Sequence, residues 1–443
     1  MKTEVAIVGG GPGGSTAAMY LIRKGIKPII IEKESFPRYH IGESMTGECG
    51  GILRDLGLTD KMTQANYPIK HGVKVYGENP WFLPVMARTS EGQLKDQTTW
   101  QVRRSQFDQM MLNEAVAQGA TLIEGQATRP LQHDNGDITG VQVRTKDGSE
   151  LEIKSELLID ASGQNTFLAN AGVTGPKYRG NYDKQMAIFS QVVDGIRDDG
   201  DSRDMQRNNT LIFYKAKYHW GWWIPIDEEV VSVGIVSPSA YFLDKRESKK
   251  QFLTRELHEL HPEFKRRLPE VKLVEEARSI PNYSFQVKKF CGRGYLCLGD
   301  AHRFVDPIFS FGLYVTMKEA QFAAGHIVAY LDGVGRDLPN PLAPYQTHCE
   351  KGIDVLEDTL DGFWEHPNAF AWMVYSKFRE QMIDVFAGRI YDNQPSTGVQ
   401  SFRKLLNRER VYDNEDIYSI PIGSRYHPER APLWDLSASI EVA

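Results

Sequence analysis

Three glycines near the start of the chain have the spacing of a phosphate-binding turn. Gly9, Gly11 and Gly14 form a GxGxxG pattern within VAIVGGGPGGSTAAMYLIRKGIKPIIIEK. In such a turn the first glycine allows the tight bend, the second lets the backbone approach a pyrophosphate, and the third lets a helix pack closely on a strand. Glu32 follows at the distance where a carboxylate can bind the hydroxyl pair of a ribose. These residues predict a dinucleotide site.

The elements around these glycines are the ones that such a site needs. We expect a strand at 4–8, a helix with Ala17 and Leu21 on its apolar face, and a second strand at 28–31. The N-terminus of this helix would offer unpaired N–H groups to the phosphates. GxGxxG alone also occurs in ordinary glycine-rich turns, but the complete strand, helix, strand and acid favour the dinucleotide site.

Four further motifs follow along the sequence: FPRYHIGES (36–44), QVRRSQFD (101–108), LLIDASG (157–163) and YLCLGDAHRFVDPIFSFG (295–312). With the glycine turn, they make the chain similar to the FAD-binding fold shared by aromatic hydroxylases and their relatives, from residue 1 to about residue 345. The resemblance implies that Asp300 binds the ribityl chain and that the next helix points its N-terminus at the flavin. The FAD contacts it implies are Gly9, Gly11, Pro12, Gly13, Gly14, Glu32, Lys33, Arg38, Ser44, Arg104, Asp160, Asp300 and Gly312. A second GxGxxG for NAD(P)H is absent from the sequence, so a separate flavin reductase is expected to supply reduced FAD.

The composition is that of an ordinary globular protein with more than one domain. The chain has 443 residues, a net charge of -6 and no dense run of Lys or Arg, so nucleic acid is not an expected partner. Its apolar runs are far shorter than the roughly 20 residues that a membrane span needs. The sequence enters a strand at once, which leaves no room for a signal peptide, and its four cysteines lack zinc-type spacing. We therefore expect reduced thiols and a cytoplasmic protein without a membrane segment.

Three tryptophans lie within four residues in the stretch YHWGWWIPI (218–226). The surrounding region, 183–284, contains the strand-like pieces MAIFSQVVD, LIFYKA, WGWWIPI and VVSVGIV, which predict a largely antiparallel sheet. On a strand, Trp220 and Trp222 point to one face and Trp223 to the other. A tryptophan pair on one face is usually core packing, so the pair alone does not decide between a core and a pocket wall.

Two patterns and one lysine extend the resemblance to the flavin-dependent halogenases that act on phenols and pyrroles. The WxWxIP pattern is carried by Trp220, Trp222, Ile224 and Pro225. The FxxPxxSxG pattern is carried by Phe304, Pro307, Ser310 and Gly312. NYPIKHGV (66–73) is similar to the segment that holds the essential lysine of that family, which implies that role for Lys70.

The resemblance implies a specific chemistry. Reduced FAD and oxygen give a flavin hydroperoxide, chloride or bromide attacks it, and the hypohalous acid that forms is relayed by Lys70 to an electron-rich aromatic ring. A buried lysine has a lowered pKa, which suits this role. The tryptophans would keep water and substrate away from the flavin. The halide would bind backbone N–H groups near Phe311 and Gly312.

The sequence departs from the family pattern at three positions. Phe311 stands where Ser, Thr or Gln is common, which leaves open a flavin monooxygenase or dehydrogenase without halide chemistry on the same scaffold. Phe309 replaces the glutamate of the tryptophan-halogenating branch, so free tryptophan is a poor candidate substrate. Asn282 is the nearest match to an aspartate that attaches FAD covalently in some relatives, so we expect non-covalent FAD. A flavoprotein that only binds FAD and a carrier protein is a third possibility.

Other polar residues give weaker signals. His302 follows Asp300 and is either a polar neighbour of FAD or a solvated loop residue. The i, i+3 pair His258 and His261 precedes Pro262 and reads better as a helix end than as a metal site. Glu43 is expected near the flavin, without a defined role.

The resulting expectation is an α/β protein with three parts. A discontinuous Rossmann-like FAD-binding domain covers 1–182 and 285–345, and an antiparallel substrate sheet covers 183–284. A mostly helical region, 346–443, caps the substrate side and includes the aromatic stretch 358–391. Its substrate is an aromatic ring, either free or attached to a carrier protein.

Overall fold

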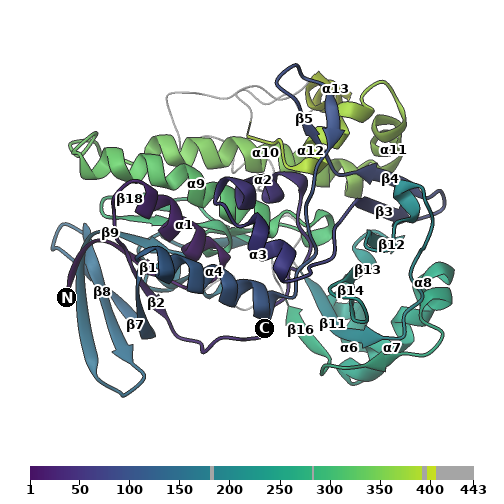
Figure 1. Cartoon of the computed structure of the whole chain (residues 1–443), viewed down its shortest axis with the longest axis horizontal. Coiled ribbons are helices and arrows are strands. Elements are labelled where there is room, and N and C mark those ends of the chain that lie inside the picture. The colour runs from purple at the N-terminus through teal and green to yellow at the C-terminus, as the bar shows by residue number, and fades with distance from the viewer. Residues whose placement is uncertain (180–183, 282–283, 392–396, 406–443) are drawn as a thin grey trace.

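A computed structural model describes residues 1–179, 184–281, 284–391 and 397–405. One half of the molecule is a sheet covered by helices (Figure 1). Its strands are β1 (Lys2–Val8), β2 (Ile29–Glu32), β7 (Thr121–Gln132), β8 (Ile138–Thr145), β9 (Glu150–Asp160), β18 (Cys291–Gly292) and β19 (Tyr295–Cys297). β1 pairs in parallel with β2 and β9, and α1 (Pro12–Arg23) packs between α4 (Arg104–Gln118) and α9 (Gly312–Leu331). This is the predicted strand–helix–strand unit, with both strands within two residues of their expected bounds.

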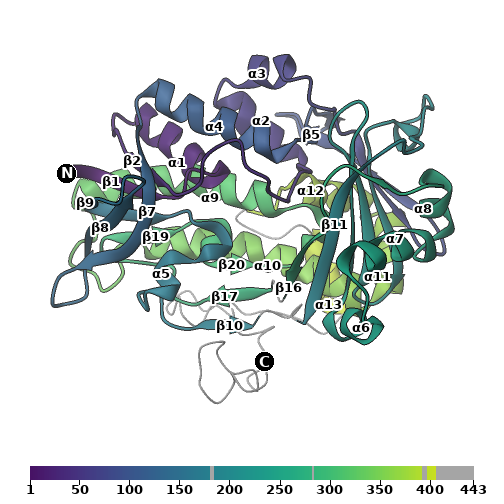
Figure 2. The same cartoon turned by 90° about the horizontal axis from the view of Figure 1, so that it is seen from below.

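The other half is a second, larger sheet that stands across the first (Figure 2). Its path is β15 (Lys272–Leu273), β11 (Gln185–Val193), β14 (Val231–Pro238), β13 (His219–Pro225), β12 (Thr210–Ala216), β3 (Gly72–Tyr76) and β4 (Trp81–Pro84), and β16 (Arg278–Pro281) pairs with β11. All these pairs are antiparallel except β12 with β3. Strands β3 and β4, which lie outside the range 183–284 expected for the substrate sheet, also belong to this sheet.

Each face of the larger sheet has its own cover. Helices α6 (Ser239–Lys245), α7 (Lys249–Glu259) and α8 (Pro262–Arg267) lie on one face, where Phe252, Phe264 and Trp223 form a separate core. The other face turns toward the FAD-binding half and carries Trp220 and Trp222 in the main core. The predicted alternation of the three tryptophans is thus confirmed.

The C-terminal region is helical, as predicted. It contains α10 (Ala343–Glu365), α11 (Pro367–Tyr375), α12 (Arg379–Ala387) and α13 (Thr397–Leu405). Phe309 reaches into this region, where its ring lies 5.2 Å from that of Phe363 and 4.5 Å from that of Phe386. These contacts tie the helices to the segment just before α9.

Short elements connect the two halves. They are α2 (Gly47–Asp55), α3 (Thr59–Gln64), β5 (Met86–Arg88) with β6 (Leu94–Asp96), α5 (Phe167–Asn170), and the three-stranded sheet β10 (Lys177–Arg179), β17 (Phe285–Val287) and β20 (Arg303–Phe304).

All four cysteines are free, buried thiols. A search of the described helices finds none with the length and hydropathy of a membrane span. The structure is α/β with two sheets and a helical C-terminal region, which confirms the predicted fold class.

Candidate active site

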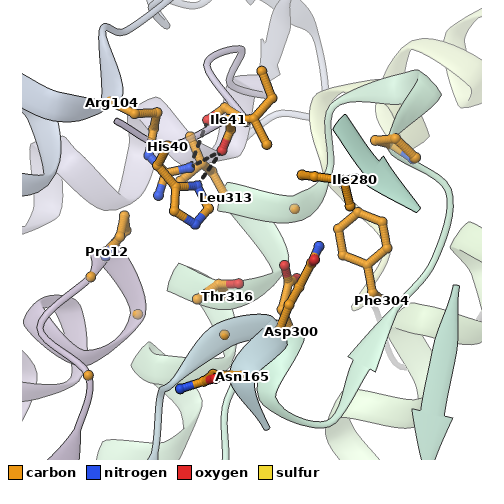
Figure 3. Close-up of a pocket in the computed structure, with 18 of the residues that line it drawn as sticks. Pro12, His40, Ile41, Arg104, Asn165, Ile280, Asp300, Phe304, Leu313 and Thr316 are labelled. Carbon is orange, nitrogen blue, oxygen red and sulfur yellow. Dashed lines mark hydrogen bonds between the residues drawn. The ribbon is translucent and has the colours of Figure 1, made fainter. Parts of the chain in front are cut away.

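A cavity of about 770 Å³ lies between the two sheets and the start of α9. Figure 3 shows part of its wall, with Arg104, Asp300 and Phe304 contributed by different elements. The predicted site residues that line it are Gly9, Gly11, Pro12, Gly13, Glu32, Lys33, Arg38, Ser44, Arg104, Trp220, Trp222, Ile224, Asp300, Phe304, Pro307, Ser310, Phe311 and Gly312. Those outside the wall are Gly14, Lys70, Asp160 and Pro225.

The glycine turn has the geometry that its spacing predicts. Gly9 has a φ of +106°, and a Cβ there would lie 2.4 Å from the Ala161 carbonyl oxygen. A Cβ on Gly14 would lie 1.9 Å from the Gly9 oxygen, so α1 can approach β1 only with glycine there. The Glu32 carboxylate accepts from the N–H of Gly10 at 2.7 Å, which ties the end of β2 to the turn. The first turn of α1 has no side-chain cap, so its N–H groups remain available to an anion.

A buried arginine cluster forms the wall next to this turn. Arg104 donates to Asp108 from Nε at 2.7 Å and from a terminal nitrogen at 2.9 Å, and it also donates to the Ile41 carbonyl at 2.6 Å. Arg38 donates to the same Asp108 carboxylate at 2.9 Å. Asp108 holds both predicted cofactor contacts in place, although we did not predict it as a site residue. Its i, i+4 spacing from Arg104 on α4 was the available signal.

The two predicted acids of the FAD-binding half have different surroundings. Asp300 lines the cavity, and burial raises its pKa to about 7 although Arg104 and Gln164 act in the opposite direction. Asp160 lies behind the wall and accepts from the backbone N–H groups of Ser162 at 3.0 Å and Leu168 at 2.7 Å. Asp160 therefore shapes the loop at 161–168, whose residues reach the cavity.

His302 occupies neither of the surroundings that we considered for it. Its side chain is buried, stacks on Phe290 at 3.9 Å, and its Nε2 lies 2.9 Å from Glu319 Oε2. Glu319 also accepts from the N–H of Gly299 at 2.6 Å. The turn that carries Asp300 is thus fixed to the middle of α9.

The start of α9 borders the cavity beside the glycine turn, since a Cβ on Gly13 would lie 2.5 Å from Thr316 Cγ2. Ser310 has a left-handed φ of +63°, and Phe311, the residue before the helix, provides no side-chain cap. The N–H groups of the first turn are therefore open to a bound group. Phe311 is only 3% exposed and contributes to the wall at the position expected for a halide.

The tryptophan strand forms the opposite wall. Trp220 and Trp222 both line the cavity, with ring centroids 5.9 Å apart. Trp222 Nε1 donates to Ser232 Oγ at 3.2 Å, whereas Trp220 Nε1 is buried without a partner among the described residues. Pro225 ends β13 and lies outside the wall. The pair is therefore both core packing and pocket wall.

Lys70 lies behind Ser44, which lines the cavity. Its N–H donates to the Thr99 carbonyl at 2.9 Å, which fixes the backbone just before β3. The side chain is 2% exposed, and Nζ donates to Ser44 Oγ at 2.9 Å and to the Met45 carbonyl at 2.8 Å. Burial lowers the pKa of Lys70 to about 7. Amine and ammonium are therefore both populated near neutral pH.

Glu43 is the strongest feature to which we had assigned no role. It lines the cavity with a side chain that is 1% exposed, and burial raises its pKa to about 7. Gln191 Nε2 approaches one carboxylate oxygen at 3.3 Å, and the other oxygen has no partner within the described part of the chain. Only the fold brings Glu43 to Gln191 on β11, so no local pattern could have found this pairing.

His258 and His261 have structural contacts at the ends of helices. His261 precedes α8 as its N-cap and accepts from the Glu263 N–H at 3.1 Å, while His258 Nε2 contacts the Leu268 carbonyl at 2.8 Å. The described ranges contain no cluster of three or more potential metal ligands. Asn282 lies outside the described residues.

These observations fit a bound FAD. The glycine turn offers free N–H groups to a pyrophosphate, Asp300 faces the middle of the cavity, and the open first turn of α9 suits the ring system, where negative charge gathers on reduction. The fold and cavity together define an FAD-binding flavoprotein. In agreement, the FAD binding domain family matches residues 2–355, most of the chain.

Similar proteins show to which family of FAD-binding flavoproteins the chain belongs. A 1H-pyrrole-2-carbonyl-(peptidyl-carrier protein) brominase of Pseudoalteromonas luteoviolacea is 34% identical over 420 residues, covering 94% of this chain and 98% of the relative. The corresponding chlorinase of Pseudomonas fluorescens is 31% identical, covering 97% and 99%. The solved structure of a flavin-dependent brominase aligns with a TM-score of 0.85 at 34% identity, covering 92% and 98%. The chain belongs to the flavin-dependent halogenases, enzymes that use FAD and a halide to halogenate aromatic rings.

Proposed function

We propose that this halogenase modifies a pyrrole ring attached to a peptidyl carrier protein, with Lys70 relaying the halogen from the FAD cavity to the ring. Two relatives that align along almost their whole length carry this substrate in their names. One is a brominase and the other a chlorinase, so both halides are candidates for this chain.

The observation that carries the proposal is the burial of Lys70 next to the cavity wall. When bound, reduced FAD with oxygen supplies the oxidation of halide to hypohalous acid. The neutral Lys70 amine can take the halogen from this acid, releasing water and forming an N–halogen bond. Transfer to the pyrrole carbon then restores the N–H bond as the ring loses its proton. Lys70 lies behind Ser44, so the oxidant and the ring can be handled on different sides of the wall.

The remaining site residues have supporting roles in this proposal. Glu32, Arg38 and Asp300 bind FAD, Trp220 and Trp222 exclude water, and the first N–H groups of α9 bind the halide beside Phe311. Without a visible nicotinamide motif, reduced FAD comes from a separate flavin reductase. We expect both proteins in the cytoplasm, where reduced nicotinamide is available.

A single-turnover experiment tests the relay. The reduced, FAD-loaded enzyme is mixed with oxygen, bromide or chloride, and either pyrrole-2-carbonyl carrier protein or free pyrrole-2-carboxylate. Wild type should halogenate the carrier-bound ring and, without substrate, also the hypohalous-acid trap monochlorodimedone. Lys70→Ala should keep trap halogenation and lose ring halogenation by about 100-fold or more, as expected when a group that acts in transfer is removed.

The matched control is Lys74→Ala, on the adjacent strand, whose side chain forms an ion pair with Asp204 at 3.0 Å. It should retain ring halogenation. Equal loss in both lysine variants, or retained activity in Lys70→Ala, would contradict the relay. Halogenation of free pyrrole-2-carboxylate at the same rate would contradict the carrier requirement, and an oxygenated product without halide dependence would favour the monooxygenase alternative.

A further inference from the structure

We propose that Ser44, together with the carbonyl of Met45, is the positioning element that holds the Lys70 amine for halogen transfer. This inference rests on the relay proposed for Lys70. It gives Ser44 a second role besides the FAD contact that the sequence resemblance implied. Ser44 is suited to both roles because it lines the cavity while its hydroxyl also contacts the lysine behind the wall.

The contacts of Lys70 match the neutral amine in number. An amine has two N–H bonds and a lone pair, and Nζ has two acceptors, Ser44 Oγ at 2.9 Å and the Met45 carbonyl at 2.8 Å. Across the described residues, Lys70 forms no ion pair with a carboxylate that would favour the ammonium form. With both N–H bonds engaged, the lone pair points in the remaining direction, where we infer that the halogen binds.

A chain of buried hydroxyl and amide groups fixes the orientation of Ser44. Ser44 Oγ lies 2.9 Å from Thr210 Oγ1, and Gln101 Nε2 donates to the same Thr210 atom at 2.9 Å and to the Asn208 carbonyl at 3.1 Å. One of these two hydroxyls donates to the other, and each oxygen also accepts a second bond, Ser44 from Lys70 and Thr210 from Gln101. The side chains of Ser44, Thr210 and Gln101 are each at most 4% exposed, so water competes little for these bonds.

The test compares Ser44→Ala with Thr46→Val. Thr46 lies two residues further on, is also buried, and its hydroxyl has no partner among the described residues, so Thr46→Val removes a hydroxyl without touching Lys70. Trap halogenation, ring halogenation and FAD affinity by fluorescence quenching are measured for both variants and for Lys70→Met. At saturating FAD, Ser44→Ala should lower the ratio of ring halogenation to trap halogenation by about ten-fold, the upper end of the net effect of one hydrogen bond.

A second readout does not depend on turnover. Protein labelled with 13C at lysine Cε is titrated by NMR, and the Lys70 signal is assigned by its loss in Lys70→Met. The Ser44 oxygen stabilises ammonium more than amine, so Ser44→Ala should lower the titration midpoint of Lys70 by about one pH unit, and Thr46→Val should leave it unchanged.

The outcomes separate this inference from the relay itself. If Lys70→Met loses ring halogenation but Ser44→Ala behaves like Thr46→Val in both readouts, the relay stands and the role of Ser44 is wrong. A Ser44→Ala defect that is confined to FAD affinity, with an unmoved Lys70 midpoint, also overturns it. Retained ring halogenation in Lys70→Met would instead overturn the relay, and with it any part of Ser44 in halogen transfer.

Discussion

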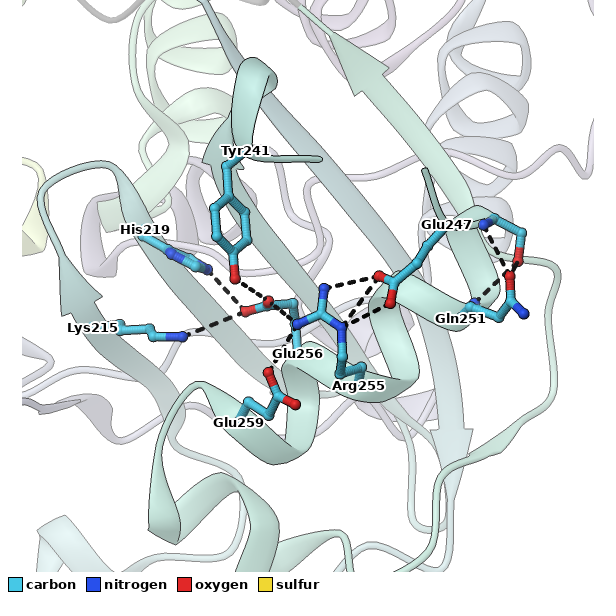
Figure 4. A network of polar contacts seen from close by, with 9 residues as sticks. Lys215, His219, Tyr241, Glu247, Gln251, Arg255, Glu256 and Glu259 are labelled. Atoms are coloured by element: carbon cyan, nitrogen blue, oxygen red, sulfur yellow. Dashed lines mark hydrogen bonds and ion pairs between the residues drawn. The ribbon is translucent and has the colours of Figure 1, made fainter. Parts of the chain in front are cut away.

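The two ends of strand β13 show two different ways of burying charge. At its start, His219 belongs to a network around Glu256 on α7 (Figure 4). Glu256 accepts from His219 at 3.0 Å, Tyr241 at 2.7 Å and Arg255 at 2.6 Å. Burial raises the pKa of Glu256, but these hydrogen bonds outweigh the effect of burial, and the pKa falls from its ordinary 4.5 to about 2. The carboxylate therefore stays ionised at any physiological pH.

Beyond His219, the same strand lines the cavity, and two buried groups in or behind the cavity wall, Glu43 and Lys70, have no ion-pair partner among the described residues. Burial raises the pKa of Glu43 and lowers that of Lys70, each to about 7, and the hydrogen bonds that Glu43 accepts do not offset its desolvation. The Glu256 network thus stabilises the fold and anchors the strand. Burial of Glu43 and Lys70 instead costs stability, and both groups can change protonation near neutral pH. Such a division is expected where activity is maintained at a cost in stability.

Removing the centre of the network should have the largest effect on stability. Glu256→Ala leaves Arg255, His219 and Tyr241 without their common acceptor and should lower the free energy of unfolding by about 3–5 kcal/mol, as for other broken buried pairs. Urea denaturation measures this. Glu259→Ala is the control, since Glu259 also pairs with Arg255 but its side chain is 54% exposed, and its loss should cost at most about 1 kcal/mol. Equal effects would mean that the network is no stronger than a surface pair.

Removing the buried Lys70 should increase the free energy of unfolding instead of lowering it. The pKa of Lys70 is about 7 in the folded state, against an ordinary 10.5. Below pH 7 the lysine is protonated in both the folded and the unfolded protein. The folded state then carries the full free-energy cost of burying an ammonium group. As pH rises between these values only the unfolded chain holds the proton, so stability increases. Lys70→Met should therefore be more stable than wild type below the folded pKa, by on the order of 5 kcal/mol, and the difference should vanish at high pH.

The control for this gain is Lys74→Met, because Lys74 already has a partner in Asp204 and should gain nothing. Urea denaturation across pH provides the curves. A Lys70→Met variant that is less stable than wild type would show that the lysine is compensated after all, and the contrast between the two regions would fail.

Glu43→Gln tests the buried acid that lines the cavity. The folded pKa of Glu43 is about 7 against an ordinary 4.5, so only the folded state keeps the proton between these values and stability falls as pH rises. Above the folded pKa the penalty is complete, and Glu43→Gln should then be more stable than wild type by about 3 kcal/mol, with no difference in acid. The control is Glu34→Gln, because this side chain is 53% exposed and its substitution should change the free energy of unfolding by less than about 0.5 kcal/mol. Parallel curves for Glu43→Gln and wild type would contradict the raised pKa.

The sequence predicts those parts of the molecule that depend on short-range patterns. The strand at 4–8, the turn at Gly9 and the alternation of Trp220 and Trp222 against Trp223 all follow from neighbours within one element. The pairing of β12 with β3 could not be read in this way, because 72–76 and 210–213 meet in parallel across a long stretch of chain.

The same limit applies to the site. Lys70 could be singled out by its segment, but its partners Ser44 and Met45 come from another loop, and burial by the whole fold sets its pKa. Glu43 shows the limit most clearly, since Gln191, whose side chain donates to its carboxylate, is 148 positions away. Protonation states of buried groups depend on desolvation, which is a property of the packed molecule and not of a motif.

The smallest expected effect lies where the two regions meet, in the tryptophan pair. Trp222 Nε1 donates to Ser232, which also bonds Glu43, whereas Trp220 Nε1 has no partner within the described residues. Both substitutions to Phe remove similar apolar area, so Trp222→Phe should be less stable than Trp220→Phe by about 1 kcal/mol, the net contribution of one hydrogen bond. If both rings exclude water, each variant should also release more hydrogen peroxide per flavin oxidised. Equal stabilities would mean that the Ser232 bond contributes nothing, and unchanged peroxide release would leave the pair as core packing alone.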